Sequence, residues 1–174
     1  MSSRENEYAL RHNLVTPTDC AVVRLILAET GFFRTDEVDV AVELLDERLT
    51  KGADSGYEFL FAEERGTVIG YACYGLIACT LGSFDLYWIA VTPHAQGQGV
   101  GQLLLSNVES EVERRQGRHI YIETSGREQY ASTRAFYAKC GYEIVATIPS
   151  FYDEGDDKVI WRKVMLTASF PSNV

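Results

Sequence analysis

The sequence lacks several features that would mark a membrane or secreted protein. It contains no run of about 18 consecutive apolar residues, so no segment is expected to span a bilayer. Residues 1–11 are polar and charged and lack the apolar core of a secretory signal. The four cysteines form no C-x-x-C pair and stand beside no histidine cluster. We therefore expect free thiols, no metal site, no membrane partner and a cytoplasmic location.

Basic residues are also scarce. The chain has 16 Lys and Arg against 25 Asp and Glu, giving a formal net charge of -9. Such a charge opposes nonspecific binding to nucleic acid, so none is expected as a partner. With 174 residues, 46% of them hydrophobic, the chain is long and apolar enough for about one folded domain.

The spacing of apolar residues predicts one α/β (α+β) domain over residues 13–166, with terminal tails at 1–12 and 167–174. Helical spacing is found at 21–29, 35–51, 100–116 and 130–140. Strand patterns are found at 14–15, 57–63, 68–77, 84–91, 119–123, 142–148 and 159–166. The predicted order is βααβββαβαββ, a mixed and mostly antiparallel sheet with helices on both faces. Because 84–91 is almost wholly apolar, we expect that strand to be covered on both sides.

A glycine-rich turn joins the strand at 84–91 to the long helix. Glycines allow backbone N–H groups to turn inward together, and a helix N-terminus adds free amides, so this turn is suited to a pyrophosphate. The dinucleotide pattern G-x-G-x-x-G fails here because its last glycine would fall on Gln102 or Leu104. The G-x-x-x-x-G-K-[ST] pattern fails because no lysine follows. The pattern Q-x-x-G-x-G fits, as Gln96, Gly99 and Gly101.

With this motif the sequence resembles the GNAT superfamily of acetyl-CoA-dependent N-acetyltransferases. A second block, Thr133 to Tyr142, is similar to the family helix that ends F-Y-x-x-x-G-[FY]. The resemblance covers roughly Asn13 to Met165. It implies that acetyl-CoA is a cosubstrate and that no metal is needed.

The resemblance also implies which residues hold the cofactor. Backbone groups of the strand would pair with the pantetheine and polarise the thioester, while the glycine loop would hold the pyrophosphate. The family's asparagine at the position of Tyr130 is missing, and Ser125, Ser132 or Thr133 would replace it. The implied cofactor-binding residues are Ile89, Ala90, Val91, Gln96, Gly97, Gln98, Gly99, Val100, Gly101, Gln102, Ser132, Arg134, Phe136 and Tyr137.

For catalysis, the resemblance makes Tyr137 the acid that reprotonates the leaving thiolate. Two carboxylates are candidates for the general base. Asp85 stands where the histone-modifying branch of the family has a Glu. Glu123 is a lone acid on an apolar strand, and a period of two puts it on one face with Tyr121. The choice between the two acids stays open.

The expected acceptor is a primary amine of a small molecule or peptide, attacked directly in a ternary complex. Aromatic and acidic residues suit a cationic amine, with Phe33 and Tyr152 as predicted substrate contacts. The acids at 153–157 equally fit a polar turn. An alternative function is a non-catalytic acyl-CoA-binding sensor or regulatory module with the same fold. The resemblance also makes a homodimer an expectation.

Overall fold

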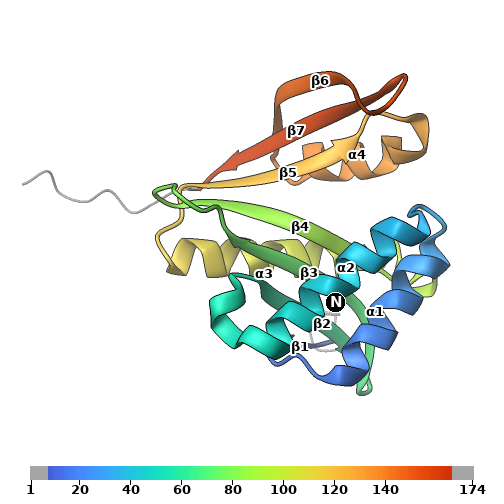
Figure 1. Cartoon of the computed structure of the whole chain (residues 1–174), viewed down its shortest axis with the longest axis vertical. Coiled ribbons are helices and arrows are strands. Elements are labelled where there is room, and N and C mark those ends of the chain that lie inside the picture. Colours follow the sequence, from blue (N-terminus) through green and yellow to red (C-terminus); the bar gives the residue numbers. More distant parts are fainter. Residues whose placement is uncertain (1–7, 166–174) are drawn as a thin grey trace, which may run out of the picture. The chain divides into compact units, whose positions relative to one another are not determined.

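The computed structural model describes residues 8–165 and confirms the predicted class and order of elements (Figure 1). The described part contains seven strands and four α-helices. Short 3-10 helices lie at Gly52–Ser55, Pro93–Ala95 and Glu128–Tyr130. The longer elements are β1 (Ala9–His12), α1 (Pro17–Thr30), α2 (Thr35–Lys51), β2 (Glu58–Glu64), β3 (Thr67–Leu76), β4 (Ser83–Val91), α3 (Val100–Arg114), β5 (His119–Ser125), α4 (Ala131–Lys139), β6 (Glu143–Asp153) and β7 (Asp156–Val164).

The first strand lies earlier than the sequence predicts. Residues 9–12 were expected in a tail, but they form β1 and pair antiparallel with β2, with Leu10 opposite Ala62. An ion pair between Arg11 and Glu63, 2.6 Å long, joins the same two strands. The predicted strand at 14–15 is not formed. These contacts come from a distant strand, so local apolar spacing could not reveal them. The predicted C-terminal tail, 167–174, lies outside the described residues.

Two compact units make up the chain. The first runs up to Gly75 and includes Leu86–Val108; the second contains Leu76–Asp85 and the chain from Glu109 onwards. Strands of the first unit follow the order β1-β2-β3-β4. Helices α1 and α2 pack on one face of this sheet, in a core that includes Leu27, Leu45, Phe61 and Tyr71. Helix α3 covers the other face, where Leu104 approaches the backbone of β3.

Burial of the strands differs from the prediction in one respect. Strands β2 and β3 are buried on both faces through most of their length. In β4 burial alternates: Phe84, Leu86 and Ala90 are buried, whereas Tyr87 is 38% exposed. The prediction that β4 is covered on both sides was therefore wrong. An apolar run does not report coverage when aromatic residues occupy the exposed face.

The second unit contains three strands in the order β5-β7-β6 and helix α4. Both pairings are antiparallel, and Ile122 and Trp161 lie opposite each other on the buried face. The strands predicted at 142–148 and 159–166 run closer together than expected: β6 ends at Asp153 and β7 begins at Asp156, and a tight polar turn joins them, with Asp153 opposite Asp156. Gly155 has φ of 73°, which suits this turn.

Candidate functional site

The loop after β4 presents a row of unused backbone donors. Leu103 N–H donates to the carbonyl of Gly99, but none of the N–H groups of residues 97–102 donates to a backbone carbonyl within residues 8–165. Gly97 and Gly99 have φ of 72° and 89°, and a Cβ atom on either would meet nothing within 4 Å. Because α3 begins at Val100, its dipole adds positive potential to these free amides. The loop therefore combines free backbone donors with open space, which are features that suit an anion.

Side chains of the loop bond back to its own framework. Nε2 of Gln96 donates to the carbonyl of Val91 over 3.1 Å, and Nε2 of Gln98 donates to the carbonyl of His94 over 2.7 Å. The hydroxyl of Tyr8 reaches Oε1 of Gln98 at 3.3 Å. These bonds turn one N–H of each glutamine amide back onto the main chain near the loop. That the main chain, rather than glutamine side chains, holds a phosphate stays a prediction.

The end of β4 that precedes the loop packs and hydrogen-bonds against β3 within the first unit. Ala90 is buried, and its carbonyl lies 3.0 Å from where a Cβ on Gly70 would be. Thr92 N–H donates to the carbonyl of Ile69 over 2.8 Å. The strand is thus held firmly at its exit, where Ile89, Ala90 and Val91 were predicted to offer backbone groups. A rigid strand end suits preorganised hydrogen bonding.

In the second unit, Tyr137 is buried within an aromatic cluster. Its ring centroid lies 5.4 Å from Phe136, 5.9 Å from Tyr142 and 6.3 Å from Trp161. Burial, followed by the nearby Cys140 thiol, raises the pKa of the Tyr137 phenol well above its usual value. This phenol therefore stays protonated at neutral pH and is available as a donor.

The two candidate bases, Asp85 and Glu123, have different surroundings. Glu123 is 48% exposed and its Oε2 lies 2.6 Å from Nζ of Lys158. Asp85 is half-buried, and its carboxylate makes no hydrogen bond or ion pair with any residue that the structure describes. Burial, and then the charge of Glu123, raise the pKa of Asp85 to about 6, while Lys158 opposes the rise. As predicted, Tyr121 and Glu123 share one face of β5, because Ile120, Ile122 and Thr124 are buried on the other.

The turn after β5 is fastened by a polar network. Ser125 Oγ donates to the buried carboxylate of Asp156 over 2.5 Å, and Arg127 Nε pairs with the same carboxylate at 3.1 Å. Arg134 Nη1 donates to the carbonyls of Ser125 and Arg127 at 2.9 and 2.7 Å. Two predicted cofactor contacts, Ser125 and Arg134, are thus already engaged in holding this turn. Ser132 is exposed at the start of α4.

The predicted acceptor contacts belong to different units. Phe33 packs edge-on against Trp88 of β4, with ring centroids 5.2 Å apart. Tyr152 is 42% exposed on β6 and packs edge-on against Phe151 at 5.0 Å. Sequence reasoning missed Trp88 and Lys158. The contact between Lys158 and Glu123 depends on the register of β5 against β7, and the sequence does not reveal that register.

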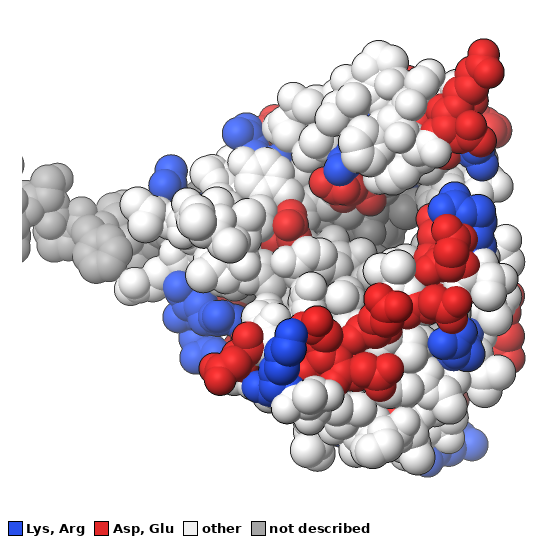
Figure 2. All heavy atoms as spheres, in the orientation of Figure 1, with Lys and Arg blue, Asp and Glu red and all other residues white. Residues whose placement is uncertain are grey.

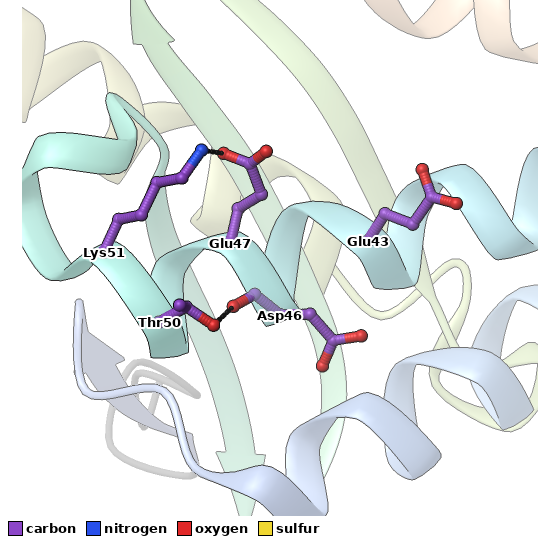
Figure 3. A pocket seen from close by; sticks show the side chains of 5 residues that line it. All are labelled: Glu43, Asp46, Glu47, Thr50 and Lys51. Carbon is purple, nitrogen blue, oxygen red and sulfur yellow. Dashed lines mark hydrogen bonds and ion pairs between the residues drawn. The ribbon is translucent and has the colours of Figure 1, made fainter.

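A separate hollow lies on the exposed face of α2, where acidic side chains gather (Figure 2). It has a volume of about 340 Å³ and contains none of the predicted site residues. Within it Lys51 pairs with Glu47 at 2.9 Å, and the Thr50 hydroxyl donates to the carbonyl of Asp46 (Figure 3). Both contacts are formed within α2, as is usual on the solvent-exposed face of a helix, so the hollow needs no ligand to explain these side chains. Its lining residues are Glu43, Asp46, Glu47, Thr50 and Lys51.

Residues 8–165 contain no group of three or more His, Cys, Asp or Glu side chains arranged to hold a metal ion. In the same part of the chain, no helix has the length and apolar character needed to cross a membrane.

Comparison with known proteins identifies the family. The family model for the acetyltransferase (GNAT) domain matches residues 55–144, which is more than half of the chain. The chain belongs to the GNAT acetyltransferase family. This GNAT protein is similar to a crystal structure from Desulfovibrio desulfuricans that is ascribed to the same family. The two share 47% identity and a TM-score of 0.88, over 91% of this chain and 99% of that one.

Curated GNAT relatives match over shorter stretches. An L-methionine sulfoximine/L-methionine sulfone acetyltransferase of Salmonella typhimurium is 34% identical over 54% of this chain and 55% of its own. The L-amino acid N-acyltransferase MnaT of Escherichia coli is 32% identical over 55% of each chain. The chain thus spans about half the length of these relatives. A solved structure of yncA from Salmonella typhimurium with its cofactor acetyl-CoA has the same fold, with a TM-score of 0.69 and 21% identity over 95% of this chain and 99% of that one.

Proposed function

We propose that this GNAT protein is an N-acetyltransferase that moves an acetyl group from acetyl-CoA to a primary amine of a small molecule or peptide. The observation that carries the proposal is the row of free N–H groups at residues 97–102, which opens at the start of α3. Acetyl-CoA contributes a reactive thioester and a pyrophosphate. A backbone cradle suits the pyrophosphate in a chain whose net charge is -9, because it needs no basic side chain.

Gly97 and Gly99 let the amides of the loop face one anion. Both adopt a left-handed backbone and leave open space where a side chain would stand. Backbone groups of Ile89, Ala90 and Val91 are proposed to bind the pantetheine and polarise the thioester carbonyl. Ordered donors of this kind are typically worth about 2.7–4 kcal/mol of activation free energy.

Asp85 is the better candidate for the general base. Its pKa of about 6 leaves the carboxylate ionised at pH 7, and this value is close enough to the working pH for efficient proton transfer. Glu123 already pairs with Lys158 at 2.6 Å. In the proposed step, Asp85 takes a proton from the acceptor ammonium, and the amine nitrogen attacks the thioester carbon directly in a ternary complex.

Tyr137 is proposed to complete the reaction. As the carbon–sulfur bond breaks, the electron pair stays on sulfur, and the Tyr137 hydroxyl supplies a proton to that thiolate. The acylated nitrogen loses its second proton to water, and the Tyr137 phenolate regains a proton from water, so the amide leaves neutral. Burial raises the pKa of Tyr137, which by itself makes the transfer harder. Apolar surroundings also raise the pKa of a thiol, which favours protonation of the leaving thiolate.

The acceptor class proposed first is the α-amine of an amino acid. Two relatives carry names that specify amino-acid or methionine-derivative substrates. The aromatic residues Phe33 and Tyr152 are retained as proposed contacts for the acceptor, because aromatic rings attract cationic amines. A homodimer remains part of the proposal from the resemblance to the family.

The test is release of CoA from acetyl-CoA across a panel of L-amino acids, other primary amines and short peptides. We expect Tyr137→Phe to lower kcat about 100-fold with little change in acetyl-CoA affinity, as is typical for loss of an acid. Tyr142→Phe is the matched control, because it removes a hydroxyl from the same cluster that bonds only to Glu109. Equal kcat in both variants would reject the role of Tyr137.

The alternative is the acyl-CoA sensor without turnover. Tight binding of acetyl-CoA by calorimetry, combined with no CoA release across the whole panel, would favour it. Absence of any acetyl-CoA binding would contradict both functions.

A further inference from the structure

Lys158 lies on β7, the middle strand of the second unit, and is held from both neighbouring strands. Its Nζ atom is 2.6 Å from Oε2 of Glu123 on β5. The same atom lies 4.4 Å from the ring centroid of Phe151 on β6. The lysine side chain is only 14% exposed. Such an ammonium is restrained far more than one in a surface ion pair.

The register of the sheet builds this contact. Lys158 stands opposite Ser125, and Glu123 stands opposite Ile160. Glu123 and Lys158 are therefore diagonal neighbours on one face, a separation that long side chains bridge easily. The next residue on β7, Val159, is buried on the other face. The backbone register thus places the two side chains within reach of each other on one face.

Asp85 is the third member of this charged group. The charged groups that act on it are Glu123 from β5 and Lys158 from β7. Burial raises its pKa first, Glu123 raises it further, and Lys158 lowers it. Lys158 therefore acts on Asp85 in two ways, directly and by neutralising Glu123.

We infer that Lys158 is a positioning residue for the proposed base: it clamps the Glu123 carboxylate and leaves Asp85 as the group that accepts the proton from the acceptor ammonium. The inference rests on the proposed acetyl transfer and gives that reaction a residue not assigned from the sequence. During the step, the proton moves from the ammonium nitrogen to an Asp85 oxygen. The Glu123 carboxylate is already held by the Lys158 ammonium, 2.6 Å away.

The test compares the acid limb of kcat/KM against pH in the full-length protein, using one acceptor throughout so that the acceptor's own ionisation cancels. Lys158→Met should move the midpoint of that limb upward by roughly one pH unit, because Asp85 then faces an unneutralised Glu123. Lys163→Met is the matched control. Lys163 lies on the same strand, pairs with Glu109 at 2.8 Å and lies 5.5 Å from the Tyr142 ring centroid, but belongs to the opposite face. In Lys163→Met the midpoint of the acid limb of kcat/KM should stay where it is in the wild type.

Two further variants keep the inference testable if Lys158→Met folds poorly. Glu123→Gln should move the limb downward, because it removes a negative neighbour of Asp85 and keeps the lysine. Phe151→Leu should move it upward by less than Lys158→Met, because the ammonium loses one of its two supports. Equal shifts in Lys158→Met and Lys163→Met, or no shift in Lys158→Met and Glu123→Gln, would overturn the inference.

A titration of the Asp85 carboxyl carbon by nuclear magnetic resonance, in the protein without ligand, separates this inference from the proposed function. If the pKa of Asp85 rises in Lys158→Met but the protein acetylates no amine, the role of Lys158 is supported and the proposed acetyl transfer is contradicted. If the protein acetylates an amine but the pKa of Asp85 is unchanged in Lys158→Met, the acetyl transfer is supported and the role of Lys158 is contradicted.

Discussion

The side-chain amide of Gln96 donates to the main-chain carbonyl of Val91 across 3.1 Å, which ties the glycine loop to the end of β4. The bond fixes the start of the loop relative to the strand that is proposed to bind pantetheine. It also explains why a glutamine suits the first position of the Q-x-x-G-x-G pattern: the side chain must reach back over the turn and donate. The glycines that follow then need only supply a backbone conformation in which the loop's amides can face one anion.

The first prediction concerns Gly99. Gly99→Asp should weaken acetyl-CoA binding more than tenfold, or about 1.4 kcal/mol, because a carboxylate would face the phosphates and the residue would resist φ of 89°. The measurement is calorimetric titration with acetyl-CoA. Gly66→Asp is the control, since Gly66 has φ of 81°, has equally open space and lies in the β2–β3 turn. Similar affinity loss in both variants would argue against the cradle.

The second prediction separates two roles of Arg134. If the guanidinium contacts the 3′-phosphate of CoA, Arg134→Met should weaken CoA about tenfold and leave 3′-dephospho-CoA almost unaffected. If it only holds the turn through the carbonyls of Ser125 and Arg127, both ligands should weaken equally. Arg127→Met serves as the comparison, because Arg127 braces the same turn through Asp156. Equal losses for the two ligands would remove Arg134 from the predicted cofactor contacts.

The third prediction concerns stability at low pH. Arg11 donates two hydrogen bonds, at 3.0 and 2.9 Å, to the buried carboxylate of Asp19. Burial raises the pKa of Asp19, but hydrogen bonds from Arg11 and Thr16 outweigh it and the pKa is lowered. Asp19→Ala should lower the free energy of unfolding by about 2 kcal/mol at pH 7, because it removes two charge-assisted hydrogen bonds from Arg11 and the cap on Thr16, and leaves Glu63 as the guanidinium's carboxylate partner.

The sign of its pH dependence follows from the lowered pKa. The contribution of Asp19 is complete above the unfolded carboxyl pKa of about 3.9 and is lost as the pH falls through the folded value. Urea unfolding of wild type and variant should therefore differ most above about pH 5 and converge in acid. Asp36→Ala, which breaks an exposed pair with Arg34, should change stability little at any pH. A constant difference down to the lowest pH would contradict this account.

The fourth prediction concerns a buried hydroxyl. Tyr71 is fully buried in the first unit's core, and its hydroxyl has no hydrogen-bond partner among the residues described. Tyr71→Phe should therefore stabilise the protein by about 1 kcal/mol, seen as a Tm increase of roughly 2–4 °C. Thr124→Val should act oppositely and cost about 1–3 kcal/mol, since it leaves the buried Trp161 Nε1 donor unpaired. A destabilised Tyr71→Phe variant would indicate that the hydroxyl has a partner.

Much of the fold could be predicted because its signals are local. Gly31 ends α1 with φ of 68°, as its position after an apolar helical pattern predicts. The Arg65–Gly66 turn between β2 and β3 was likewise evident from the turn residues. The N-terminal strand was misplaced because β1 is short, half-exposed and defined by its partner β2. The acids at 153–157 do form a polar turn, but β6 and β7 extend further into it than predicted, because composition does not show how far two strands pair.

By itself the sequence determined the order of elements, the glycine loop with its helix and the family, because each depends on residues close together along the chain. Tertiary structure alone decided the surroundings of the two candidate carboxylates. Asp85 and Glu123 are both acidic residues on predicted strands, so the sequence does not separate them. The register of β5 against β7 lets Lys158 form an ion pair with Glu123, while burial raises the pKa of Asp85. Ion pairing and desolvation depend on distances between strands, which no local pattern of residues encodes.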